Sequence, residues 1–298
     1  MDVTVVGSIA LDTVETPSGL NEEGLGGAAT FFSLAAANYA PVHLVGVVGE
    51  DFPEEHVRLL QSKKIVLDGL ERAQGKTFRW TGKYHEDVNN RDTLETQLNV
   101  FEQFHPKLPA AACEAPFLFL GNIHPSLQIE VLEQAKPKFV GLDTMNLWIN
   151  IAQNELREVL KRVDVIIIND SEVRDLTGET NLVKGAKAVK ALGPRIVVIK
   201  KGEHGCLLYS DEDIFSAPAY PIEEVVDPTG AGDTFAGGFL GHLAGTGKTD
   251  AATLRQAVIH GSVVASFTCE KFGPDRLAEI GLADIKARFA EFKKLAEF

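Results

Sequence analysis

Cysteine is scarce in this sequence, which contains only Cys113, Cys206 and Cys269 among its 298 residues. The three are far apart, no pair has the CxxC spacing, and their number is odd. A disulfide framework would need pairs, and a cysteine zinc site would need closely spaced ligands, so the pattern argues against both. Such cysteine usage is typical of a reducing compartment.

Long apolar runs are also absent. No stretch approaches the roughly 18 apolar residues that indicate a membrane-spanning helix. The N-terminus reads MDVTVVGSIALD, and its short apolar run has no basic segment before it, so it does not have the form of a signal peptide. We therefore expect a cytoplasmic location and no membrane partner.

Basic residues are outnumbered, with 29 Lys and Arg against 42 Asp and Glu and a net charge of −13. This charge repels nucleic acid unless a basic cluster exists, and the adjacent lysines at 63–64 and 200–201 are only pairs. We therefore expect no nucleic-acid partner. An anionic small molecule would have to be neutralised locally, by Mg²⁺ or by backbone N–H groups.

What the sequence does contain is an alternation of short apolar runs and helical segments. The predicted strands cover residues 3–7, 43–48, 117–120, 138–142, 163–168 and 195–199, and the predicted helices include 27–39, 126–135 and 181–192. No linker or repeat interrupts the chain. The pattern predicts one α/β domain over residues 1–298, with a mostly parallel sheet between two helical layers. Ligands bind at the carboxyl ends of the strands in such sheets.

One region departs from this alternation. Two runs flank a polar turn over residues 86–92, and their apolar members are Phe78, Trp80 and Tyr84 on one side and Leu94, Leu98 and Val100 on the other. This predicts a β-hairpin with one apolar face. We expect a small β lid, formed from about residues 12–24 and 72–104, that covers a substrate or joins two subunits in a homodimer. An ordinary edge hairpin is the alternative.

The segment 227–239 reads DPTGAGDTFAGGF and carries the strongest chemical signal. Small residues at Gly230, Ala231 and Gly232 let the backbone turn and present its N–H groups at the start of a helix, where anions bind. A carboxylate at Asp233 could accept the proton of a hydroxyl that attacks a phosphoryl group held there. A Gly-rich turn with Asp233 as a helix cap is the alternative, and local physics leaves both open.

This segment resembles the C-terminal signature of the ribokinase-like (PfkB) carbohydrate kinases, usually written D-T-x-G-A-G-D, with Pro228 in place of a common Thr. The resemblance spans nearly the whole chain. It implies a ribokinase-like three-layer α/β/α fold and an ATP-dependent kinase. It also implies that Asp233 is the catalytic base and that the amides of Gly230, Ala231 and Gly232 form an anion hole.

The N-terminal part agrees with this resemblance. Asp12, which follows the first predicted strand, resembles the family's sugar-binding Asp, although a solvated loop carboxylate is the alternative. Gly26 and Gly27 resemble the N-terminal signature and are assigned to the substrate. The family usually has an Asn about four residues later, whereas this chain has Thr30 and then Phe31. That departure admits a more apolar substrate, which we expect Thr30 to contact.

Two further elements resemble the nucleotide end of the family's site. Asn169-x-x-Glu172 resembles the element that organises Mg²⁺ and phosphate, and a helix cap at Asn169 is a compatible alternative. The run from Lys200 resembles the family's T-x-G-x-x-G nucleotide loop, with Lys200 in the Thr position and Gly202 and Gly205 at the usual spacing. We assign these residues to ATP.

Other assignments depend on position alone. Gly261 falls in the family's adenine region, and a monovalent cation is expected near Asp227. Asn122 and Asn146 follow predicted strands and are expected to face the substrate. The run GTGKT at 245–249 lacks the earlier Gly and the preceding strand of a P-loop, so it is predicted to be the end of a helix.

The predicted reaction is Mg²⁺-dependent transfer of the γ-phosphoryl group of ATP to a hydroxyl of a sugar or sugar-like molecule. A nucleoside kinase of the same fold is one alternative. A non-catalytic small-molecule binding module is another, and the intact run from Gly230 to Asp233 argues against it.

Overall fold

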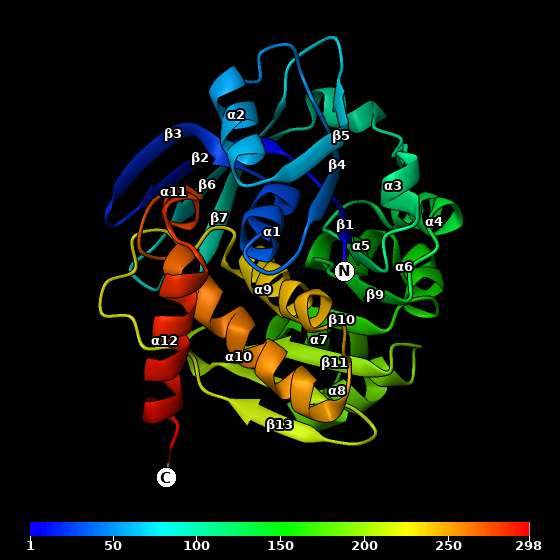
Figure 1. Ribbon diagram of the computed structural model, residues 1–298, viewed down its shortest axis with the longest axis vertical. Coiled ribbons are helices and arrows are strands. Elements are labelled where there is room, and N and C mark those ends of the chain that lie inside the picture. The colour runs from blue at the N-terminus through cyan, green and yellow to red at the C-terminus, as the bar shows by residue number, and fades with distance from the viewer. Residues whose placement is uncertain (298) are drawn as a thin grey trace.

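Short apolar strands form a nine-stranded central sheet in a computed structural model that describes residues 1–297 (Figure 1). The strand order is β13-β12-β11-β10-β9-β8-β1-β4-β5, and β12 pairs antiparallel with both of its neighbours while the other pairs are parallel. The strands are β1 (Val3–Val6), β4 (Val42–Val48), β5 (Ile65–Arg72), β8 (Phe117–Leu120), β9 (Phe139–Leu142), β10 (Val165–Asn169), β11 (Ile196–Lys200), β12 (Cys206–Tyr209) and β13 (Ile214–Ala217). The predicted α/β fold with a mostly parallel sheet is confirmed.

Helices cover both faces of this sheet, because its strands are apolar on both sides. Val5 belongs to the core on one face and Val6 to the core on the other. The first face is covered by α1 (Ala28–Ala36), α2 (Glu54–Ser62), α9 (Ala231–Thr246), α10 (Ala251–Thr268), α11 (Asp275–Glu279) and α12 (Leu282–Leu295). The second is covered by α3 (Ala110–Cys113), α4 (Pro125–Gln134), α5 (Asn146–Ile151), α6 (Gln153–Leu160), α7 (Asp170–Thr177) and α8 (Leu182–Lys190).

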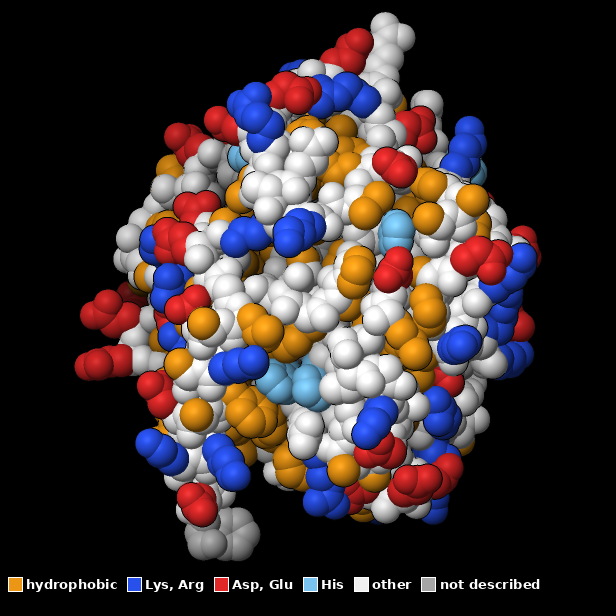
Figure 2. Space-filling view, viewed as in Figure 1, with side chains coloured by type: hydrophobic (Ala, Val, Ile, Leu, Met, Phe, Trp, Pro, Cys, Tyr) orange, Lys and Arg blue, Asp and Glu red, His pale blue; other side chains and the backbone are white. Residues whose placement is uncertain are grey.

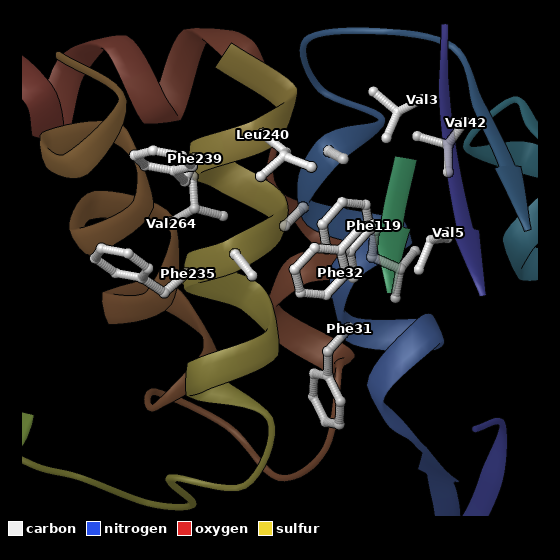
Figure 3. Close-up of a cluster of buried hydrophobic side chains, with 14 of the residues drawn as sticks. Val3, Val5, Phe31, Phe32, Val42, Phe119, Phe235, Phe239, Leu240 and Val264 are labelled. Atoms are coloured by element: carbon white, nitrogen blue, oxygen red, sulfur yellow. The ribbon is translucent and has the colours of Figure 1, made fainter. Parts of the chain in front are cut away.

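Close packing fixes α1 against both the sheet and α9. The ring of Phe32 in α1 stacks on that of Phe119 in β8, with centroids 4.4 Å apart and planes within 9° (Figure 3). A Cβ on Gly237 of α9 would collide with the backbone of Phe32, so a glycine is needed there for the two helices to approach. The start of α9 is thereby held beside α1, with Phe31 at the junction (Figure 3).

A second, four-stranded sheet lies beside the main one, in the order β3-β2-β6-β7. Its strands are β2 (Ala10–Thr16), β3 (Gly19–Gly26), β6 (Phe78–Tyr84) and β7 (Arg91–Gln97). The pair β2–β6 is parallel, whereas β3 and β7 run antiparallel to their neighbours. Two segments separated by about fifty residues in the sequence therefore form one sheet, which we call the lid.

The prediction of a single apolar face on the hairpin is wrong for β7. On β6, Trp80 and Tyr84 do share a face, but the residues of β7 opposite them are Thr96 and Arg91. A β-bulge shifts the register and leaves Leu94 out of the pairing, and Leu94 is 59% exposed. The later apolar positions lie beyond the end of β7. This face of the lid is therefore partly polar, which suits a surface that meets a site rather than a core.

The surface of the protein is mixed in charge on the face shown in Figure 2, where acidic and basic side chains are interspersed and apolar side chains lie between them. Within residues 1–297, none of the helices combines the length and the apolar character that crossing a bilayer requires.

Candidate active site

The carboxyl ends of five neighbouring strands bring polar residues to one edge of the central sheet. Ser8 follows β1, Asn122 follows β8, and Asp143 follows β9. Asn169 and Lys200 are the last residues of β10 and β11, where they lie opposite each other in register. A doubly covered parallel sheet forms a crevice at this edge, and ligands bind in it.

The loop before α9 is ordered by Asp227. One oxygen of this fully buried carboxyl accepts the N–H of Thr229 at 2.8 Å, and the other accepts the N–H of Gly273 at 3.0 Å. Gly230 then begins the helix as its N-cap, with φ 75° in the left-handed region that favours glycine. The carboxyl of Asp227 thus fixes the shape of the turn that follows it.

The first turn of α9 presents backbone N–H groups toward the same edge. The Ala231 N–H donates to Pro228 O at 3.2 Å, and the Thr234 N–H makes the first helical bond to Gly230 O at 2.8 Å. The N–H groups between them belong to the helix start, which lacks intrahelical acceptors and attracts anions. Asp233 is the third residue of the helix, so the alternative that it serves as the N-cap is wrong.

Asp233 has a pKa raised to about 7. The main cause is desolvation, because the charged carboxylate loses hydration among the surrounding groups. The negative charge of Asp143 raises the pKa further, whereas the positive charges of Lys200 and Arg91 lower it. A carboxyl that titrates near neutral pH can take up a proton during a reaction and release it afterwards, as a general base must.

Lys200 brings a positive charge among these carboxyls. Its Nζ lies 3.7 Å from Oδ1 of Asp143. On the other side, a Cβ on Gly232 would lie 2.9 Å from the same Nζ, so the ammonium sits against the start of α9. Burial alone would lower the pKa of Lys200, but the charges of Asp143, Glu172 and Asp233 raise it, and the ammonium stays charged.

Asn169 and Glu172 form a capping box at the start of α7. The Asn169 Oδ1 accepts the Glu172 N–H at 2.8 Å, and the Glu172 Oε2 accepts the Asn169 N–H at 2.9 Å. The pKa of Glu172 is raised to about 7, first by burial and then by Asp143. The helix-cap interpretation of this motif is therefore correct, and it leaves Oε1 of Glu172 outside the cap.

The oxygen atoms at this edge fit Mg²⁺ that is bound together with nucleotide phosphates. Mg²⁺ usually keeps several waters and takes one or two carboxylates beside the phosphate oxygens. Glu172 and Asp143 are two carboxyls at this edge, and the charge of Asp143 raises the pKa of Glu172. In the described part of the chain, no group of three or more His, Cys, Asp or Glu side chains could hold a metal ion. Two carboxyls without a complete set of protein ligands suit a metal ion that enters the site already bound to nucleotide phosphates.

Asp12 reaches the same space from β2 of the lid. It is 7% exposed, so the alternative of a solvated loop carboxylate is wrong. A Cβ on Gly26 would collide with the Asp12 carboxyl, and the Gly27 N–H hydrogen bonds to it. Burial raises the pKa of Asp12 to about 7, and the negative charges of Asp227 and Asp233 contribute to the rise. The lid carboxyl and the helix carboxyl therefore share one site.

The lid also contacts the loops on either side of the site, through residues that sequence reasoning had not assigned. The Thr229 hydroxyl donates to the Tyr84 hydroxyl at 3.3 Å. The predicted nucleotide loop turns at Gly202 and Gly205, which both have positive φ. A Cβ on Gly202 would lie 2.5 Å from Oδ1 of Asn89, so the tip of the hairpin touches this loop.

Arg91 is the second cation of the site and was missed. Its guanidinium carbon lies 5.5 Å from the centre of the Trp80 ring, and its charge lowers the pKa of Asp12, Glu172 and Asp233. The sequence placed it in the polar turn, whereas it begins β7 opposite Tyr84. Alternation along β6 places Trp80 and Tyr84 on one face. Extending this alternation through the turn into the next strand could have indicated Arg91.

Two predicted substrate residues are engaged in local structure. The Asn122 Oδ1 accepts the Trp148 Nε1–H at 2.8 Å, and its Nδ2 donates to Met145 Sδ at 3.1 Å, so its amide holds α5 in place. Asn146 is exposed, and its Oδ1 accepts the Leu147 N–H at 2.9 Å. Their backbones follow β8 and β9 as predicted, and their contact with a substrate stays a prediction.

Two other predicted residues are buried in helices. Thr30 is completely buried in α1, and its hydroxyl has no hydrogen-bond partner within residues 1–297. Gly261 lies inside α10, where a Cβ would be 2.8 Å from Phe235 O, so it permits the close packing of α10 on α9. The glycine is thus explained by packing, and the assignment of Gly261 to the nucleotide stays a prediction. The P-loop-like run at 245–249 spans the end of α9 and its C-cap Gly247, as predicted.

Comparison with known proteins agrees with this geometry. The pattern of the pfkB family of carbohydrate kinases matches residues 2–280. A cytidine kinase of Thermococcus kodakarensis is 35% identical over 249 residues, which are 80% of this chain and 87% of that protein.

Solved structures share the fold at low sequence identity. A nucleoside kinase of Burkholderia thailandensis in complex with inosine has a TM-score of 0.79 at 20% identity, covering 97% of this chain and 98% of that one. A ribokinase-type protein of E. coli in complex with ATP and Mg²⁺ has a TM-score of 0.77 at 19% identity, covering 97% and 99%. At these identities the likeness shows the fold alone.

Proposed function

Because the chain belongs to the pfkB family of carbohydrate kinases and is a phosphotransferase, we propose that it transfers the γ-phosphoryl group of ATP to a hydroxyl of a sugar or nucleoside. The observation that carries this proposal is the meeting of two carboxyls from distant parts of the chain. Asp12 comes from the lid and Asp233 from the start of α9, and they lie close enough for the charge of Asp233 to raise the pKa of Asp12. One carboxyl can hold an acceptor while the other removes its proton.

In the proposed reaction, Asp233 takes the proton of the acceptor hydroxyl while the oxygen of that hydroxyl attacks the γ-phosphorus. A new oxygen–phosphorus bond forms, the bond from phosphorus to the bridging oxygen breaks, and ADP leaves with that electron pair. The backbone N–H groups of Gly230 and Gly232 hold the phosphoryl oxygens while negative charge develops on them, whereas the Ala231 N–H, also assigned to the anion hole, donates to Pro228 O. Asp227 contributes by fixing the turn that carries these groups.

Mg²⁺, when bound with ATP, neutralises phosphate charge. Glu172 offers its Oε1 toward that role, while its Oε2 stays in the capping box with Asn169. The loop from Gly202 to Gly205 lies under the tip of the lid and would hold the nucleotide. A monovalent cation near Asp227 stays a prediction, since both oxygens of this carboxyl already accept backbone N–H groups.

A nucleoside is the acceptor that the lid favours over a simple sugar. Trp80 lies opposite Asp12 in the parallel pair β2–β6, so both side chains point to the same face. A nucleoside presents ribose hydroxyls that a carboxylate can bind and a planar base that an aromatic ring can stack against. Phe31 adds another ring beside the start of α9. The cytidine kinase relative supports the same choice.

The experiment that tests this function measures ADP release with ATP and Mg²⁺ across a panel of nucleosides and sugars. We expect turnover with at least one nucleoside, weaker turnover with free sugars, and loss of turnover in Asp233→Asn. Turnover with sugars alone would replace the nucleoside assignment. Binding of a panel member without any ADP release would support the non-catalytic alternative and contradict the kinase.

A further inference from the structure

Lys200 occupies a position that the proposed mechanism does not yet use. It is the last residue of β11, opposite Asn169 of β10, so its side chain starts at the carboxyl edge of the sheet. The chain then reaches across to α9, where Nζ lies 2.9 Å from the point that a Cβ on Gly232 would occupy. The ammonium is thus held directly beside Gly232, the last residue of the turn that presents its N–H groups to a phosphoryl group.

The ammonium is not saturated by the carboxyls around it. A charge-assisted hydrogen bond from nitrogen to a carboxylate oxygen is about 2.7–2.9 Å long, whereas Lys200 Nζ and Asp143 Oδ1 are 3.7 Å apart. Other ion pairs of this protein do reach that range, for example Lys83 with Glu15 at 2.8 Å. The Lys200 side chain is 18% exposed. A partly exposed ammonium without a short hydrogen bond to a carboxylate is suited to a further anionic partner.

Three carboxyls keep Lys200 charged in the absence of such a partner. Asp143, Glu172 and Asp233 all act to raise its pKa against the effect of burial. The electrostatic effect is mutual, since the Lys200 ammonium lowers the pKa of each of these carboxyls. Lys200 therefore affects the base as well as the place where the phosphoryl group would lie.

We propose that Lys200 is a catalytic residue that completes the anion hole, its ammonium contacting the oxygens of the phosphoryl group as that group passes from ATP to the acceptor. This inference rests on the proposed function and deepens it, because the nucleotide-loop assignment alone would make Lys200 a binding residue. Lys200 keeps its proton throughout the transfer, and only Asp233 gains one. A lysine acts on phosphates as a point charge, which is most useful where negative charge develops.

The test compares Lys200→Met, which keeps length and removes the charge, with Lys200→Arg, which keeps the charge. Removing one donor from an anion hole typically lowers kcat by about 10²–10³-fold, and we expect Lys200→Met to fall in this range with little change in KM for ATP. Lys200→Arg should recover much of the loss. Lys136→Met is the matched control, because Lys136 forms an exposed ion pair with Glu114 and should behave as the parent does.

The pH profile provides a readout that a structural role would not move. Asp233 is influenced by Asp143, Lys200 and Arg91, and removing Lys200 takes away one charge that lowers its pKa. The acid limb of kcat/KM in Lys200→Met should therefore shift to higher pH. The shift should be absent in Lys200→Arg.

Three results would overturn the proposal: parental kcat in Lys200→Met, a loss confined to KM for ATP, or a kcat loss with an unmoved acid limb. The second would return Lys200 to nucleotide binding alone. If Lys200→Met melts below the assay temperature, Lys200→Gln takes its place in the same comparison. Failure of the proposed function is distinguishable, because it would appear as absence of ADP release by the parent protein.

Discussion

The ring of Phe31 lies against Gly230, and a Cβ at Gly230 would collide with three carbon atoms of that ring. Gly230 also has φ 75°, a conformation that costs an L-residue about 1–2 kcal/mol. Helix α1 and the start of α9 therefore meet at a position where only glycine fits. This contact sets the place of the backbone N–H groups that follow.

Gly230→Ala should lower both stability and kcat, because relieving the collision must move the turn that holds the phosphoryl group. Gly247→Ala is a matched control, since Gly247 has φ 68° at the other end of the same helix. Both variants should lose about 1–2 kcal/mol from the left-handed conformation, but only Gly230→Ala should also lose turnover. Thermal melts and kcat measurements check this. Equal kcat values in the two variants would contradict a role for the turn.

Asp233→Asn should lower kcat by at least about 10²-fold, the usual contribution of a general base. The amide keeps the size of the side chain and cannot accept the proton. For the parent, kcat/KM should rise with pH through about 7, because the base must be ionised. ATP binding to Asp233→Asn, measured by calorimetry, should stay close to that of the parent. Full turnover by this variant would end the assignment of Asp233 as base.

The same carboxyl should make the fold less stable as pH rises. Its pKa is raised from 3.8 to about 7, so between these values the folded state binds more protons than the unfolded state. The free energy of unfolding then falls as pH increases. Asp233→Asn removes this pH-dependent loss of stability. The variant should melt at a higher temperature than the parent at pH 8, and at a similar temperature at pH 4. A variant less stable than the parent at pH 8 would show that the carboxylate stabilises the fold.

Asp12→Asn should raise KM for the acceptor far more than KM for ATP. The Asp12 carboxyl lies in the lid, and losing a hydrogen bond to a charged group costs roughly 1.5–3 kcal/mol. Glu15→Gln is a control in the same strand, because Glu15 pairs with Lys83 at an exposed position. Steady-state kinetics with each substrate varied in turn distinguish the two effects. Equal rises in both KM values would place Asp12 outside the acceptor site.

Glu172→Gln should raise the Mg²⁺ concentration needed for half-maximal activity. A glutamine at this position still accepts the Asn169 N–H in a capping box, so the start of α7 and the melting temperature should change little. Only the charge offered to the metal is lost. Coincident Mg²⁺ titrations of variant and parent would contradict the role given to Glu172.

Local pattern was sufficient to predict six of the nine strands of the main sheet, whereas β5, β12 and β13 were not predicted. The strand over 117–120 was predicted with its observed limits, because its short apolar run is bounded by Pro116 and Gly121, and such residues often mark the ends of a strand. The carboxyl ends of such strands then indicated Asn122 and Asn169. Each of these inferences uses residues that are neighbours in the sequence.

The rest of the site depends on contacts between distant segments. The β-bulge near Leu94 changes which of the later residues of β7 face β6, and the place of Arg91 opposite Tyr84 depends on where the hairpin turns rather than on alternation within one strand. The meeting of Lys200 with Gly232 depends on how α9 packs against the sheet. Gly261 illustrates a related ambiguity, since a glycine that allows two helices to pack closely gives the same signal in the sequence as one that binds a ligand.

The position of Asp12 within the lid sheet has a thermodynamic consequence. Since this carboxyl belongs to β2, which pairs with both β3 and β6, any displacement of the sheet carries away the group that we propose to hold the acceptor. Acceptor affinity and the closed population of the lid are therefore coupled, and the apparent Kd varies inversely with the closed fraction. By linkage, an acceptor must favour the closed state by the same free energy that the closed state adds to its binding. We therefore expect the lid to close, with Asn89 against Gly202, before a phosphoryl group is exposed to water. ATP would then react only when the acceptor site is occupied.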